Sequence, residues 1–131
     1  VLLIYMTRQL VETTAFKTGA MFASGDEQMS KVLTLMHAKF NDRLTMDVLA
    51  KAASMSKFRF SEHFRTVVGQ TPLEYLTFYR IAMAQKLLKK DQQVKFVAPG
   101  VGYKSTSAFL RKFREVVGTT PGEWARQFQH K

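Results

Sequence analysis

Apolar residues recur at helical spacing along most of the chain, and short polar turns separate these stretches. The first clear stretch begins after Thr45, a typical helix N-cap, with Leu44 and Leu49 placed as a hydrophobic staple around it. A polar turn at residues 54–56 follows. The next helix is expected to end at Gly69, because glycine commonly terminates helices in the left-handed conformation. Two helices joined by so short a turn predict a helix-turn-helix unit.

A sequence repeat indicates that this pattern occurs twice. Residues 60–75 (FSEHFRTVVGQTPLEY) and 109–124 (FLRKFREVVGTTPGEW) are identical at nine of sixteen positions, at a constant offset of 49. The segments just upstream correspond less closely, at an offset one residue shorter. The chain is therefore expected to contain two units with the same local structure.

A longer apolar stretch connects the two units. Thr71 and Pro72 are typical of a helix start, and we expect one helix from Pro72 to Lys89. Its apolar stripe is predicted to consist of Leu73, Leu76, Ile81, Ala84, Leu87 and Leu88. The expected fold is therefore all-α, with two helix-turn-helix units of the homeodomain-like kind joined by a linker helix.

The second helix of each unit has two distinct faces at about 100° per residue. The core faces are predicted to carry Phe60, Phe64 and Val67 in the first unit and Phe109, Phe113 and Val116 in the second. The opposite faces carry Phe58, Ser61, Glu62 and Arg65 in the first unit and Ser107, Leu110, Arg111 and Arg114 in the second. Such a mixture suits the major groove of DNA, where arginine chelates guanine and apolar groups contact the thymine methyl. A linker of 18 residues spans roughly 27 Å and, with the helices that it joins, could place these two helices about one duplex turn, roughly 34 Å, apart.

The charge distribution agrees with a polyanionic partner. The chain has 20 Lys and Arg against 10 Asp and Glu, a net charge of +10. Residues 44–131 hold 15 basic and 6 acidic side chains, and residues 1–43 hold 5 and 4. Basic side chains that neutralise phosphates release condensed counterions. Charge alone does not separate DNA from RNA or an anionic membrane.

The chain offers little for catalysis or metal binding. It contains no cysteine, which excludes disulfides, thiol nucleophiles and cysteine-ligated metals. Its three histidines are not at ligand spacing, and no Ser/His/Asp set stands out, so we expect no enzyme activity, cofactor or metal. No apolar run approaches the roughly 18 residues that a membrane span requires. A protein-interaction module whose basic face only steers association is the remaining alternative.

Several motifs together resemble the DNA-binding domain of the AraC/XylS family of bacterial transcription regulators. In the first half these are Leu49-Ala50-x-x-Ala53-x-Met55-Ser56, Phe60-x-x-x-Phe64-Arg65, Gly69-x-x-Pro72-x-x-Tyr75 and the linker pattern Arg80-x-x-x-Ala84-x-x-Leu87-Leu88. In the second half they are Val97-Ala98-x-x-Val101-Gly102-Tyr103-x-Ser105, Phe109-x-x-x-Phe113-Arg114 and Gly118-x-x-Pro121-x-x-Trp124. The resemblance covers about residues 30–128.

The resemblance implies sequence-specific binding of double-stranded DNA by a bacterial activator or repressor. It implies seven helices, the third and sixth inserted in successive major grooves, and divides the chain at residues 1–29 (connector), 30–71 (first unit), 72–90 (linker) and 91–131 (second unit). The candidate DNA-binding residues, from the helix faces and the resemblance together, are Phe58, Arg59, Ser61, Glu62, Arg65, Thr106, Ser107, Leu110, Arg111 and Arg114. It further implies cytoplasmic location and RNA polymerase as a partner. We expect a missing N-terminal part with a cupin-type sensor domain, through which a homodimer forms.

Three positions leave alternatives open. Pro99 lies within an expected helix, so either that helix ends near Ala98 with Gly100 absorbing the strain, or the second unit is weakened. Glu62 either accepts a hydrogen bond from cytosine or pairs within its helix with Arg59, Arg65 or Thr66. Phe58 either contacts DNA or packs against Tyr75 or the linker. The arginines Arg65 and Arg114 are expected on phosphates or carboxylates rather than bases, and Trp124 in the core.

Overall fold

The computed structural model describes residues 26–128, and this part of the chain contains seven α-helices and no strand. The helices are α2 (Glu27–Ala38), α3 (Met46–Ala52), α4 (Lys57–Val68), α5 (Pro72–Lys89), α6 (Val94–Gly100), α7 (Thr106–Val117) and α8 (Pro121–Arg126). The prediction of an all-α fold is confirmed. Most of the predicted connector, residues 1–25, lies outside the described residues.

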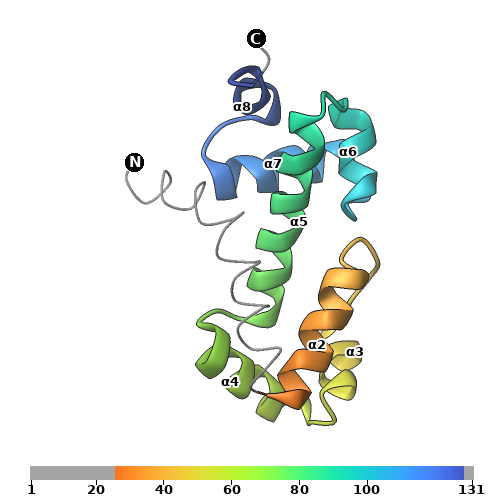
Figure 1. Cartoon of the computed structure of the whole chain (residues 1–131), viewed down its shortest axis with the longest axis vertical. Helices are drawn as coiled ribbons and strands as arrows, with labels where there is room; N and C mark the ends of the chain where they lie inside the picture. The colour runs from red at the N-terminus through yellow and green to blue at the C-terminus, as the bar shows by residue number, and fades with distance from the viewer. Residues whose placement is uncertain (1–25, 129–131) are drawn as a thin grey trace.

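Helix α5 is the axis of the molecule, with α2, α3 and α4 at one end and α6, α7 and α8 at the other (Figure 1). Each end has its own hydrophobic core. Tyr75 and Leu76 of α5 belong to the core of the first unit, and Ile81 and Leu88 belong to that of the second. The two units are therefore built around successive stretches of one helix.

The repeat in the sequence is a repeat in the structure. Helices α3 and α6 both have seven residues, and α4 and α7 both have 12. The hydroxyls of Ser56 and Ser105 accept hydrogen bonds from the third backbone N–H of α4 and α7 respectively. Gly69 and Gly118 end these helices with φ of 93° and 97°. These caps satisfy backbone groups that every helix end leaves without partners.

Four phenylalanines fill the two cores as predicted. Phe60, Phe64, Phe109 and Phe113 are fully buried, and within each pair the ring centroids lie 5.7 Å apart. Trp124 of α8 is also buried, and its ring lies edge-on to Phe113. Each buried aromatic side chain contributes about 1.5–3 kcal/mol through the area that it removes from water. The aromatic side chains thus fix how α4 and α7 pack on α5.

The linker helix has the predicted bounds but a different buried face. Thr71 and Glu74 form a capping box at its start. Leu73, which we predicted in the apolar stripe, is 49% exposed, while Tyr75, Tyr79 and Gln85 are buried. A single stripe was the wrong expectation, because α5 packs against a different set of helices at each end.

The expectation that Pro99 ends its helix near Ala98 was wrong. Helix α6 continues through Pro99 to Gly100, and the backbone N–H of Val101 still donates to the Val97 carbonyl. Proline removes one hydrogen bond from the last turn, but the helix has the same length as α3. Gly102, and not Gly100, adopts the left-handed conformation that ends the helix.

Candidate nucleic-acid interface

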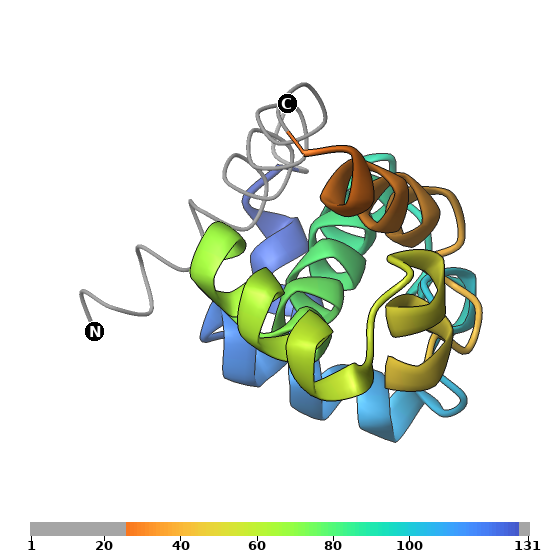
Figure 2. The ribbon, with the colours of Figure 1, turned by 90° about the horizontal axis from the view of Figure 1, so that it is seen from below.

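Helices α4 and α7 lie along the same side of the molecule, opposite α2, and run in the same general direction (Figure 2). They are the third and sixth of the described helices. Figure 1 shows them at opposite ends of α5, one unit beyond the other. The arrangement makes α4 and α7 two roughly parallel ridges on one side of the molecule.

Four candidate residues of α4 have solvent-exposed side chains: Phe58, Arg59, Glu62 and Arg65. Ser61 is half-buried. The Phe58 ring is 78% exposed, so the alternative in which it packs against Tyr75 or the linker was wrong. The ring is therefore accessible to a partner on the outer face of α4.

Within residues 26–128, Glu62 forms no ion pair with Arg59 or Arg65 and no hydrogen bond with Thr66. The intrahelical pair that we considered for Glu62 is therefore absent. Its carboxylate remains available as an acceptor on the outer face of α4.

The second ridge has the same exposure with different chemistry. Its candidate residues Thr106, Ser107, Leu110, Arg111 and Arg114 are all exposed, and Leu110 is 38% exposed. In the described part of the chain, neither Arg111 nor Arg114 forms an ion pair. Hydrogen bonds from Thr120 hold the pKa of Glu123 below its usual value, and the nearby charges of Arg126 and Arg114 add to this effect.

Equivalent positions on the two ridges carry contrasting groups. At the offset of 49, Glu62, which accepts hydrogen bonds, corresponds to Arg111, which donates them. Phe58 corresponds to Ser107, and Ser61 to Leu110. Two helices with the same packing therefore offer different hydrogen-bonding patterns to a partner.

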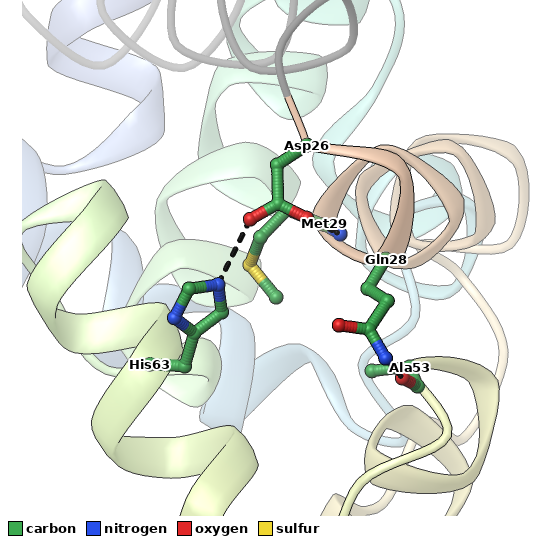
Figure 3. A network of polar contacts seen from close by, with 5 residues as sticks. All are labelled: Asp26, Gln28, Met29, Ala53 and His63. Carbon is green, nitrogen blue, oxygen red and sulfur yellow. Dashed lines mark hydrogen bonds and ion pairs between the residues drawn. The ribbon is translucent and has the colours of Figure 1, made fainter.

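A polar network ties α4 to the start of α2 (Figure 3). Asp26, the N-cap of α2, accepts a hydrogen bond from Met29 N, and its other oxygen lies 2.9 Å from Nε2 of His63 in α4. The His63 partner, aided by the Met29 backbone bond, lowers the pKa of Asp26. Gln28 also donates to the Ala53 carbonyl at 3.0 Å. Sequence reasoning missed this network because Asp26 and His63 are 37 residues apart, and no local pattern connects them.

A second missed network fixes α2 on the linker helix. Nε2 of His37 lies 2.7 Å from the Tyr75 hydroxyl, and the His37 ring stacks on Tyr79 with centroids 4.4 Å apart. Burial lowers the pKa of His37 and raises the pKa of Tyr79. The described histidines therefore serve packing and positioning, and no group of residues in residues 26–128 has the composition of a metal site.

Comparison with known proteins identifies the family. A helix-turn-helix domain family matches residues 49–127. An AraC-like transcription regulator of Streptomyces antibioticus is 33% identical over 128 residues, which are 96% of this chain and 42% of the relative. RclR of Escherichia coli, an RCS-specific transcriptional activator, is 40% identical over 81 residues, which are 61% of this chain and 28% of RclR. The chain thus spans less than half the length of these relatives.

Solved structures lead to the same family. The DNA-binding domain of AdpA, a global transcriptional factor solved in complex with a target DNA, matches with a TM-score of 0.73 and 28% identity. The match covers 77% of this chain and 92% of that domain. The fold and the two exposed ridges define a double helix-turn-helix domain. The chain belongs to the AraC/XylS-type helix-turn-helix family, as its motifs indicated.

Proposed function

We propose that this domain binds double-stranded DNA sequence-specifically and regulates transcription, with α4 and α7 in successive major grooves of one duplex face. The observation that carries the proposal is the placement of two equivalent helices on one side of α5, each with an exposed outer face (Figure 2). The linker of 18 residues spans about 27 Å and, together with the helices that it joins, could place α4 and α7 about one duplex turn, roughly 34 Å, apart.

The proposal assigns affinity and specificity to different groups. Arginines that form no ion pair within residues 26–128, such as Arg59, Arg65 and Arg114, supply contacts to phosphates, which carry affinity but no sequence information. Glu62 and Arg111 supply opposite readouts, because carboxylate accepts from cytosine N4 and guanidinium donates to guanine O6 and N7. The two half-sites are therefore expected to differ in sequence.

In-vitro selection of sites from random duplex DNA tests this function. We expect a bipartite consensus of two unlike half-sites, and affinity that falls as salt rises because phosphate contacts release counterions. Salt-dependent binding with no sequence preferred after selection would instead favour an interaction module whose basic face only steers association.

Roles of the longer protein form a further part of the proposal. The relatives are more than twice as long as this chain, which leaves room in them for another domain. We propose that the longer protein has a cupin-type sensor domain and forms a homodimer through it. We also propose that it contacts RNA polymerase and acts in the cytoplasm. No helix in residues 26–128 combines the length and the apolar character needed to cross a membrane. Size measurement by light scattering, on the full protein and on this domain, tests the dimer: only the full protein is expected to dimerise.

A further inference from the structure

The two units are held together by little besides α5. In the described part of the chain, α2, α3 and α4 pack on one another and α6, α7 and α8 do likewise, but extensive helix packing between the units occurs only through α5. An open cleft of about 490 Å³ lies between them, lined by Asn41, Arg43, Arg80 and Lys104 among others. The orientation of one unit relative to the other therefore depends on α5 and on the contacts made across this cleft.

The loops on either side of this cleft nevertheless meet at one point. A Cβ atom added to Gly102, in the turn between α6 and α7, would come 3.0 Å from the Cα of Asn41, in the loop after α2. Phe40 packs against both cores. At the equivalent turn of the first unit, Ser54 also has a positive φ, of 57°, yet its side chain is exposed. The close approach at Gly102 is thus a property of this junction and not of the repeated turn.

Arg80, from the middle of α5, bridges the two loops. Its Nε donates to the Phe40 carbonyl at 2.7 Å, and its Nη2 donates to the Asp42 carbonyl at 2.9 Å. On the other side, the guanidinium carbon lies 5.9 Å from the centre of the Tyr103 ring, within cation–π range. One rigid, planar group thereby forms two hydrogen bonds with the first unit and lies within cation–π range of a ring of the second unit.

We propose that Arg80 is a positioning residue that sets the relative orientation of α4 and α7, and thereby the spacing of half-sites that the domain accepts. The residue acts without touching DNA. When the orientation is fixed in advance, binding of the second helix follows binding of the first as an intramolecular step at high effective concentration. This inference rests on the proposed function, since it concerns how two DNA-binding ridges cooperate.

Spin labels give a test that needs no DNA. The chain contains no cysteine, so Thr66→Cys on α4 and Glu115→Cys on α7, which are equivalent exposed positions, label cleanly. In the free domain we expect a narrow distance distribution for native Arg80 and a broad one for Arg80→Met. Arg80→Lys keeps the charge but cannot donate to both carbonyls in the same geometry, so it is expected to broaden the distribution too. Equally narrow distributions in folded variants would overturn the proposal.

Titration with DNA completes the experiment. On the selected bipartite site, Arg80→Met is expected to bind about tenfold more weakly than the native domain. On either half-site alone the two are expected to bind equally, since the substitution changes only how binding of α4 and binding of α7 reinforce each other. Arg80→Met is also expected to tolerate an added base pair between the half-sites better than the native domain. Lys90→Met, at the exposed C-cap of the same helix, controls for the loss of one charge. Equal losses on half-sites and full site would contradict the proposal. If the native domain itself ignores sequence, the proposed function fails, while the spin-label distances still decide the role of Arg80.

Discussion

Arg111 offers the sharpest prediction, because its side chain has no structural task in the described part of the domain. It is exposed on the outer face of α7 and forms no ion pair or hydrogen bond there. Arg111→Ala therefore leaves no buried group without a partner, and the free energy of unfolding is expected to change by less than about 0.5 kcal/mol. The loss falls on the complex, where a bidentate contact to guanine contributes about 1–3 kcal/mol. At 25 °C this is roughly a 5- to 150-fold loss of affinity.

The assay is equilibrium binding to the selected site and to its variants at each base pair of the α7 half-site. The native domain is expected to lose affinity when the guanine opposite Arg111 is changed, and Arg111→Ala to be indifferent to that change. Lys95→Ala serves as the control, because it removes one positive charge from α6 and not from the outer face of α7. Lys95 is exposed, and its Nζ lies over the Phe96 ring. A loss from Arg111→Ala that is uniform across all sequences would refute base contact and make Arg111 a phosphate contact.

Three further predictions concern stability, measured as the free energy of unfolding in denaturant. Gln85→Leu is expected to stabilise the domain by about 1–3 kcal/mol, because the Gln85 amide is fully buried and neither of its polar atoms has a hydrogen-bond partner in the described residues; a destabilised variant would contradict this. Because the pKa of Asp26 is lowered in the folded state, its carboxylate stabilises the domain at neutral pH, and this stabilisation is lost as the pH falls below about 4. Asp26→Asn is therefore expected to make the free energy of unfolding depend less on pH in the acid range. An unchanged pH dependence would exclude the Asp26–His63 pair as the source of the acid sensitivity. Pro99→Ala restores one backbone donor in α6 and is expected to stabilise the domain by about 1 kcal/mol, because the regained hydrogen bond outweighs the added freedom of the unfolded chain; an unchanged or lower stability would contradict this.

Local signals in the sequence predicted the helices well. Thr45, Ser56, Thr71 and Gly69 marked helix ends, because a short side chain that caps a backbone N–H, or a glycine with positive φ, acts within a few residues. The repeat strengthened these assignments, since each of the two copies indicated the same turn. The core phenylalanines followed from helical periodicity alone.

Contacts between residues far apart in the chain could not be predicted from the sequence. Leu73 fits the apolar periodicity of α5, yet its side chain is 49% exposed, although Pro72, Tyr75 and Leu76 near it are buried. Gln85 and Tyr79 are polar by type but buried, because α5 is covered by different helices at each end. Arg80 was recognised as part of a motif, but its carbonyl partners are about 40 residues earlier in the chain. Nothing local predicts which loop an arginine will meet.

The central claim is that α4 and α7 occupy successive major grooves, and methylation interference on the selected site tests it most directly. Methylation at guanine N7 blocks contacts in the major groove, where each base pair presents its distinguishing groups. We expect two clusters of interference on one face of the duplex, centred about 10 base pairs apart, with Arg111→Ala removing a guanine from one cluster only. A single cluster, or two clusters half a turn apart, would contradict it.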